Sequence, residues 1–228
     1  MLLKPGSRLL FIGDSITDCG RRRPVGDGTS PRALGDGYVG LVQSALVAGY
    51  PDYRLQVLNM GVSGDTVREL QARWNSDVLA LRPDWLSILI GINDVWKQLD
   101  STDPSEEPIG LEVYASTLRE LIARTWQHLS GLILMTPYYL QPDRSDPMRA
   151  RMDRYGSIVR QVASERQAVL VDTQAAFDQV LEWVRPNELA ADGIHVNQAG
   201  HMILARAVLE RVGYDWHRPP AAPQGAPR

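Results

Sequence analysis

The sequence predicts an α/β protein whose parallel β-sheet lies between two layers of helices. Two observations predict this fold class. Short runs rich in Leu, Ile and Val alternate along the chain with longer segments of helical period. The short runs are bounded by Gly, Pro, Asn or Asp, as are the buried strands of parallel sheets. Regular alternation of strand and helix favours a parallel sheet that is covered on both faces.

Five short segments carry the strand pattern. These are Leu9 to Ile12, Gln56 to Asn59, Trp85 to Ile90, Leu132 to Met135 and Ala168 to Asp172. We expect them to form one five-stranded parallel sheet in the order 2-1-3-4-5. That order makes the fold a flavodoxin-like three-layer α/β/α arrangement.

Helical periodicity fills the intervals between these strands and recurs after the last one. Helices are expected at Tyr38 to Ala48, Val67 to Leu81, Leu111 to Leu129, Met148 to Ser164 and Asn197 to Val212, with a shorter one at Gln174 to Trp183. We expect Thr66 to cap the second of these helices, because Glu69 follows three residues later and completes the pattern of a capping box.

Two loops and the C-terminus depart from this alternation. Gly20 to Gly37 is rich in Gly, Pro and Arg, and Lys97 to Pro108 is rich in Asp, Ser, Pro and Glu. A loop as long as the first is uncommon inside a compact domain and is often functional, although a plain surface excursion remains an alternative. Residues 1–216 fit a single domain, and the Pro-rich residues 217–228 are expected to be disordered unless a partner binds them.

The composition is typical of a soluble globular protein, with 44% hydrophobic residues, 22% charged residues and a formal net charge of -3. The chain therefore has no basic excess that would recruit nucleic acid or an anionic membrane. No segment approaches the roughly 20 apolar residues that cross a bilayer. With one cysteine, Cys19, no intramolecular disulfide can form. Lys4, Pro5 and Arg8 interrupt the apolar N-terminus, so no signal peptide is predicted and we expect a cytoplasmic protein.

Ser15 follows the first predicted strand, in the segment FIGDSITD. Sites of open α/β sheets form at such strand ends. The hydroxyl of Ser15 is suited to act as a nucleophile there, and its backbone N–H at a positive helix end can help to hold an oxyanion. The alternative is that Asp14 or Ser15 merely caps a helix, and the fragment taken alone favours that interpretation.

Two further segments at strand ends offer hydrogen-bond donors. Gly61 follows the second strand, where a glycine lets the backbone approach a substrate closely and can offer its N–H. Asn93 follows the third strand and carries a neutral amide, which can stabilise developing negative charge. Taken alone, each is equally consistent with an ordinary turn or a helix cap. Asp94 is expected to make local structural hydrogen bonds only.

Asp192 and His195 lie in a loop before the last predicted helix. An Asp three residues before a His can orient the imidazole and leave its other nitrogen free to act as general base, although a surface His is the alternative. No metal site is expected, because Cys19 stands alone and His195 and His201 lack the spacing of a helical metal pair. Cys19 is expected to be a small buried residue rather than a second nucleophile.

Together and in this order, the four segments resemble the SGNH (GDSL) hydrolases over roughly residues 9–216. The four letters correspond here to Ser15, Gly61, Asn93 and His195, with Asp192 as the acid partner. Further strings are similar to the acetyl-xylooligosaccharide esterases (acetylxylan esterases) of that family. These strings are LLFIGDSITDCGR, DWLSILIGINDVW, ILMTPYY, DPMRARMDRYG, VDTQAAF and AGHMILARA.

The resemblance implies a serine carboxylesterase that needs no cofactor and removes acetyl groups from acetylated xylo-oligosaccharides. Ser15, His195 and Asp192 would form its catalytic triad. The backbone N–H groups of Ser15 and Gly61 and the side chain of Asn93 would form its oxyanion hole. The resemblance also implies an intracellular homo-oligomer.

Two alternatives to this function remain open at the level of sequence. The protein could be an SGNH lipase or thioesterase that acts on longer acyl chains, or a carbohydrate-binding protein without turnover. Trp96 follows the Asn93 segment, and we assign it to substrate binding because an aromatic face suits the C–H face of a sugar ring. Core packing is the commoner fate of a tryptophan and is the alternative for Trp96.

Overall fold

A computed structural model describes residues 1–28, 32–100 and 108–219, with only the backbone of residues 99 and 100. At its centre is a five-stranded sheet in which all neighbouring strands are parallel and the order is β2-β1-β3-β4-β5. The strands are β1 (Arg8–Gly13), β2 (Gln56–Asn59), β3 (Trp85–Leu89), β4 (Gly131–Met135) and β5 (Val169–Val171). The predicted strands, their order and the flavodoxin-like arrangement are confirmed.

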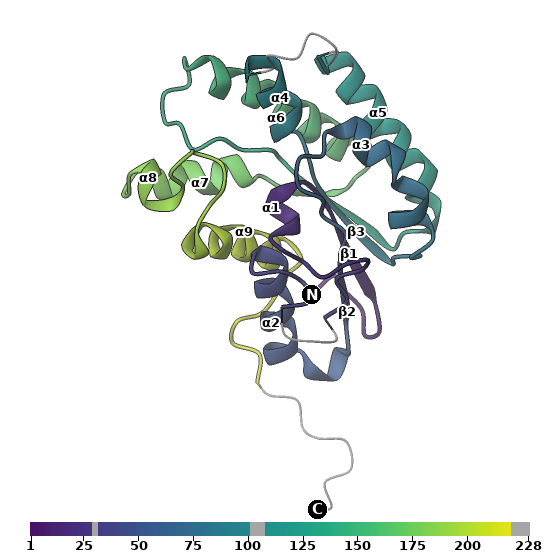
Figure 1. Ribbon diagram of the computed structural model, residues 1–228. Helices are drawn as coiled ribbons and strands as arrows, with labels where there is room; N and C mark the ends of the chain where they lie inside the picture. Colours follow the sequence, from purple (N-terminus) through teal and green to yellow (C-terminus); the bar gives the residue numbers. More distant parts are fainter. Residues whose placement is uncertain (29–31, 101–107, 220–228) are drawn as a thin grey trace, which may run out of the picture.

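Helices cover both faces of this sheet (Figure 1). The α-helices are α1 (Ser15–Asp18), α2 (Tyr38–Gly49), α3 (Val67–Ala72), α4 (Ile92–Asp100), α5 (Leu111–Thr125), α6 (Pro147–Glu165), α7 (Thr173–Leu181), α8 (Pro186–Leu189) and α9 (Gln198–Arg211). Helices α2, α7 and α9 pack together on one side, while α3, α5 and α6 pack on the other. Short turns η1 (Pro51–Tyr53) and η3 (Trp126–His128) follow α2 and α5.

The sheet is the inner layer of the hydrophobic core. All of β3 is buried, and β1 is buried beyond its first residue. Because β1 lies between β2 and β3, the chain leaves β1 and β3 in opposite directions across the sheet, and their carboxyl ends form the switch point where sites of this fold class lie. Gly13 at the end of β1 pairs with Leu89 at the end of β3, so the segments that follow these two strands begin side by side.

The helix predicted at Val67 to Leu81 is shorter than expected. Regular helix ends at Ala72, and a π-helical turn, η2 (Asn75–Leu79), follows. Between them, Trp74 is fully buried and its Nε1 donates to the hydroxyl of Thr125 at 2.8 Å, while Arg73 turns toward the carboxyl end of β1. Irregular turns of this kind often occur near functional sites, and here the turn delivers Arg73 to the site.

Two predicted segment boundaries are wrong. The segment Lys97 to Pro108 begins as helix, because α4 continues to Asp100, and residues 101–107 lie outside the described part. The packed chain also continues beyond residue 216, where we placed the end of the domain. Arg218 forms two hydrogen bonds with Asp52, at 2.7 and 2.8 Å, and lies over the ring of Tyr50. Residues 220–228 lie outside the described part.

Candidate active site

Ser15, His195 and Asp192 form a continuous hydrogen-bonded relay. The Oγ of Ser15 lies 3.0 Å from Nε2 of His195, and Nδ1 of His195 lies 2.6 Å from Oδ2 of Asp192. An ionised carboxylate only accepts hydrogen bonds, so Nδ1 carries the ring hydrogen and Nε2 is left to accept the hydroxyl proton. The structure thus brings together three residues that are up to 180 positions apart in the sequence.

The loop before α9 holds Asp192 by its own backbone. The N–H groups of Ile194 and His195 donate to Oδ1 of Asp192 at 2.9 and 2.8 Å. Burial would raise the pKa of Asp192, but hydrogen bonds from the His195 ring and from these two N–H groups outweigh it and lower that pKa below its ordinary value. Asp192 therefore stays ionised where its charge can stabilise an imidazolium.

Ser15 is the first residue of α1, and Asp14 is the N-cap. The carboxylate of Asp14 accepts the N–H of Ile16 at 3.0 Å, so the capping role weighed against catalysis falls to Asp14. No described residue accepts the backbone N–H of Ser15. This N–H, beside the nucleophilic oxygen, is available to an oxyanion.

Asn93 lies in the first turn of α4 and is half-buried. One N–H of its amide donates to the carbonyl of Asp65 at 2.8 Å. An amide nitrogen has two hydrogens, so a second remains for a ligand. Asn93 therefore holds the loop after β2 in place and can also serve as a donor to substrate.

The prediction that Gly61 is an oxyanion donor is wrong. Its N–H donates to Oδ1 of the fully buried Asn59 at 2.9 Å, and its carbonyl accepts from Nε of Arg21 at 2.7 Å. Gly61 is required for another reason: a Cβ here would lie 2.2 Å from the backbone nitrogen of Asp18. The glycine lets the loop after β2 pack directly against α1.

Gly64 is the better donor candidate in this loop. It adopts a φ of +88°, a conformation that favours glycine, and a Cβ placed on it would meet no atom within 4 Å. Within the described chain, no acceptor takes its backbone N–H. Its neighbour Asp65 is tied to Asn93, so Gly64 lies at the level of the proposed oxyanion hole. The sequence signal that marks it is the second glycine of GVSGDT, which our interpretation passed over.

Two buried carboxyls are sequence neighbours of Ser15 and Asn93. Asp14 and Asp94 are each 1% exposed. Burial raises the pKa of each to about 7, although Asp14 accepts a backbone N–H from Ile16 and Asp94 accepts one from Val67 at 3.0 Å. Oδ2 of Asp94 has no hydrogen-bond partner among the described residues. The local structural role expected for Asp94 matches its bond to the start of α3.

Cys19 is half-buried rather than buried, and it has a histidine neighbour that is distant in sequence. Its Sγ lies 3.1 Å from Nε2 of His201. Burial raises the pKa of the Cys19 thiol to about 11 and lowers the pKa of His201 to about 4. Both groups are therefore neutral at physiological pH, which argues against Cys19 as a second nucleophile.

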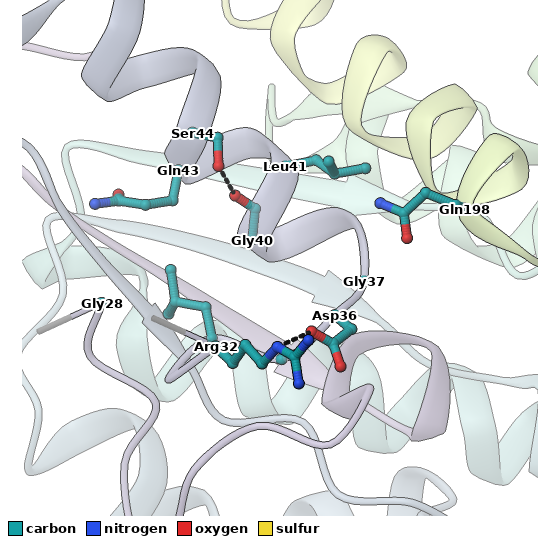
Figure 2. A pocket seen from close by; sticks show the side chains of 11 residues that line it. Gly28, Arg32, Asp36, Gly37, Gly40, Leu41, Gln43, Ser44 and Gln198 are labelled. Carbon is teal, nitrogen blue, oxygen red and sulfur yellow. Dashed lines mark hydrogen bonds and ion pairs between the residues drawn. The ribbon is translucent and has the colours of Figure 1, made fainter. Parts of the chain in front are cut away.

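A wide hollow lies in front of α2, and the triad does not line it. It has a volume of about 670 Å³ and is lined by the loop before α2, by the first turns of α2 and by Gln198 of α9 (Figure 2). Arg32 and Asp36 form an exposed ion pair at its edge, 3.6 Å apart. None of the residues described along its walls belongs to the triad, so this hollow is not the catalytic centre.

A much smaller apolar cavity, of about 10 Å³, lies next to the triad. It is lined by Asp14, Ile16, Leu89, Ile92, Pro137, Tyr138 and Ile194. Ile16 and Ile194 are the chain neighbours of Ser15 and His195, but neither Ser15 nor His195 is among the lining residues, which are all buried. Trp96 is partly buried and packs against the core, which leaves its predicted substrate contact a prediction.

The chain matches the model of the GDSL-like lipase/acylhydrolase family over residues 11–203, and it belongs to that family. It is 52% identical over 218 residues to an acetylxylan esterase of Geobacillus stearothermophilus, a match that covers 96% of this chain and 99% of the relative. No helix in residues 1–28, 32–100 and 108–219 is long and apolar enough to cross a membrane.

Solved structures give the same assignment. The crystal structure of Axe2, an acetylxylan esterase from Geobacillus stearothermophilus, is 52% identical and superposes with a TM-score of 0.92 over 95% of this chain and 98% of that one. LAE5, an alpha/beta hydrolase enzyme from the metagenome of Lake Arreo, Spain, is 47% identical, with a TM-score of 0.91 over 94% of this chain and 98% of that one. Other Axe2 structures are of catalytic mutants in which a serine, an aspartate or a histidine is replaced by alanine.

Gly61→Ala should destabilise the fold and impair the site together. The added methyl would overlap the backbone of α1, which no side-chain movement can relieve. We expect a loss of unfolding free energy of about 1–3 kcal/mol, typical of overpacking, measured by urea denaturation. Gly110→Ala is the matched control, because a Cβ there meets nothing within 4 Å. Unchanged stability and activity in Gly61→Ala would contradict the packing role.

Asp94→Asn should flatten the pH dependence of stability. The folded pKa of Asp94, about 7, lies above its ordinary value of 3.8, so between these values the folded state binds more protons than the unfolded state. Stability should therefore fall as pH rises from about 4 to about 7. Asn cannot ionise, so the variant should lose less stability over this window in chemical denaturation at several pH values. Glu165→Gln, which removes an exposed carboxylate, should not flatten the curve; an Asp94→Asn curve parallel to wild type would refute the assignment.

Proposed function

We propose that this protein is a serine carboxylesterase that removes acetyl groups from acetylated xylo-oligosaccharides. The observation that carries the proposal is the assembled relay from Ser15 through His195 to Asp192. The 52% identity to an acetylxylan esterase over nearly the whole chain supports the substrate class. The residue types replaced in the Axe2 catalytic mutants are the three types that form this relay.

The first half of the reaction transfers the acetyl group to the enzyme. Nε2 of His195 accepts the proton of Ser15 as Oγ attacks the acetyl carbonyl, and Asp192 stabilises the imidazolium. The negative oxygen of the tetrahedral intermediate is held by the N–H groups of Ser15 and Gly64 and by the amide of Asn93. Each such donor contributes roughly 3–4 kcal/mol to the transition state. His195 then protonates the sugar oxygen, which leaves as a hydroxyl.

The second half repeats these steps with water. His195 removes a proton from a water molecule that attacks the acetyl-enzyme, and the same donors hold the second oxyanion. Collapse of this intermediate releases acetate, and the proton returns to Oγ of Ser15. Every proton in this scheme moves through His195.

Similarity to a known esterase supports a short acyl group, because this chain is 52% identical to an acetylxylan esterase. A long acyl chain would gain about 0.8 kcal/mol for each methylene that an apolar groove buried. An enzyme with such a groove would therefore favour long acyl esters over acetate esters. The identity to an acetylxylan esterase makes the lipase and thioesterase alternative less well supported.

A non-catalytic carbohydrate-binding role is also disfavoured. A binding protein has no need for a histidine that is oriented by an ionised aspartate and bonded to a serine hydroxyl at 3.0 Å. For substrate recognition, we keep Trp96 as the candidate platform for a sugar ring, and a raised KM for acetylated xylobiose in Trp96→Ala would support it.

The test of the function is acetate release from defined acetylated xylo-oligosaccharides, together with a series of acyl esters from acetate to octanoate. We expect acetate release, and a fall in kcat/KM along the series. Ser15→Ala removes one oxygen and should abolish turnover with an unchanged circular dichroism spectrum. Turnover by the folded variant would remove Ser15 from its role. A rise in kcat/KM toward octanoate, without acetate release from the sugars, would instead favour the lipase or thioesterase.

We also propose that the protein is a cytoplasmic homo-oligomer. The side chain of Trp183, just after α7, is 87% exposed, and that of Trp216 is 48% exposed. Large exposed aromatic side chains are enriched at protein interfaces. Light scattering at micromolar concentration should give the mass of two or more chains of 25.4 kDa, and the mass of a single chain would refute the assembly. Cell fractionation would test the location.

A further inference from the structure

Asp18, the last residue of α1, is a buried carboxylate to which the proposed mechanism gives no role. Its side chain is 6% exposed. Its Oδ2 accepts both the backbone N–H and the hydroxyl of Ser63, at 3.1 and 3.0 Å. The guanidinium of Arg23 binds both carboxylate oxygens, at 3.1 and 2.7 Å. Asp18 therefore accepts four hydrogen bonds, two of which come from one residue of the loop after β2.

This arrangement connects the two halves of the proposed oxyanion hole. Helix α1 carries the N–H of Ser15, and the N–H of Asp18 closes its single turn on the carbonyl of Asp14 at 2.9 Å. The loop after β2 carries the N–H of Gly64, the residue directly after Ser63. Asp18 is thus a direct side-chain link between the segment that bears the nucleophile and the segment that bears the second donor.

The direction of the Gly64 N–H depends on such links. Gly64 has a φ of +88° and open space where a side chain would be, so nothing in the residue itself restricts its peptide planes. On its C-terminal side, the carbonyl of Asp65 is bound by Asn93, and the carboxylate of Asp65 accepts from Nε of Arg73 at 2.6 Å. On its N-terminal side, the loop is held at Ser63 by Asp18.

The charge of Asp18 is compensated, which a site for an oxyanion requires. Burial would raise the pKa of Asp18, but hydrogen bonds from Arg23 and Ser63 outweigh it and lower that pKa below its ordinary value. Asp18 is therefore ionised, and the adjacent positive charge of Arg23 offsets its repulsion of a developing negative oxygen. The pair can fix the loop at little electrostatic cost to the transition state.

We propose that Asp18 is a positioning residue for ester hydrolysis, which fixes the backbone N–H of Gly64 relative to that of Ser15 through its two hydrogen bonds to Ser63. The inference rests on the proposed esterase function. Asp18 touches neither substrate nor reacting atoms, so it acts only through the loop. Its loss should weaken binding of the transition state more than binding of the ester.

The first measurement is the split between kcat and KM for a small acetate ester. In Asp18→Ala, kcat should fall by about 10²-fold, the size of effect that a misplacement of about 1 Å produces, while KM changes little. Asp18→Asn keeps one acceptor oxygen and should lose less. Glu165→Gln is the matched control, because Glu165 also binds an arginine through two hydrogen bonds, both 2.8 Å, on the distant helix pair α5 and α6. The control should keep the wild-type kcat.

The second measurement separates positioning from simple stability. Phenylboronic acid adds the Ser15 oxygen to boron while the proton passes to His195, and the tetrahedral adduct places a negative oxygen among the same donors. Its inhibition constant should rise in Asp18→Ala by about the factor by which kcat/KM falls. Ser63→Ala removes only the hydroxyl bond and should give a smaller loss of kcat. Because both changes act on the same link, Ser63→Ala should cost less in the Asp18→Ala background than in wild type.

The outcomes are distinguishable. If the folded Asp18 variants keep the wild-type kcat and the wild-type affinity for phenylboronic acid, the positioning role is refuted, even where thermal unfolding shows a loss of stability. If Asp18→Ala does not fold, an unchanged kcat in both Asp18→Asn and Ser63→Ala refutes it equally. A wild-type protein that neither hydrolyses acetate esters nor binds the boronate would overturn the proposed function, and this inference with it.

Discussion

The close contact between the loop after β2 and the single turn of α1 is the constraint on which the candidate site depends. The two segments meet backbone to backbone at Gly61, where a Cβ would lie only 2.2 Å from the nitrogen of Asp18. Such contact leaves no room for side chains between them, so polar groups at the margin must hold the segments in register. Three side chains do this through hydrogen bonds to main-chain atoms. Asn59 donates to the carbonyl of Thr17, Arg21 donates to the carbonyl of Gly61, and Asp18 accepts the N–H of Ser63.

Catalytic groups in this protein are placed mostly by backbone hydrogen bonds. Asp192 is oriented by two N–H groups of its own loop before it meets the His195 ring. Arg73, which lies between α3 and η2, donates to the carbonyls of Met60 and Gly13 at 2.6 and 3.0 Å. Backbone positions follow from the fold itself, so a site fixed in this way requires little reorganisation when substrate binds.

The sequence predicts the fold well because its signals are local. Each strand is a short apolar run between helix-forming segments, and the order of the strands follows from the alternation of strand and helix. The sequence marks Ser15, Asn93, Asp192 and His195 as candidates for the same reason, since each follows a strand end or precedes a helix within a recognisable segment. Of these, Ser15, His195 and Asp192 meet in one hydrogen-bonded relay, whereas Asn93 donates to the carbonyl of Asp65.

What the sequence did not reveal depends on contacts between distant backbone segments. Gly61 and Gly64 are equally small, and the choice between them as donor turns on which N–H is already bonded, a fact set by the side chain of Asn59. In the sequence, nothing distinguishes Asp18 from the other acidic residues, because its partners Ser63 and Arg23 are identified only by the fold. In the same way, the contact between Cys19 and His201 joins residues that are 182 positions apart. The motif therefore identifies the atoms that react, whereas the residues that hold those atoms in place are specified by the packing of α1 against its neighbours.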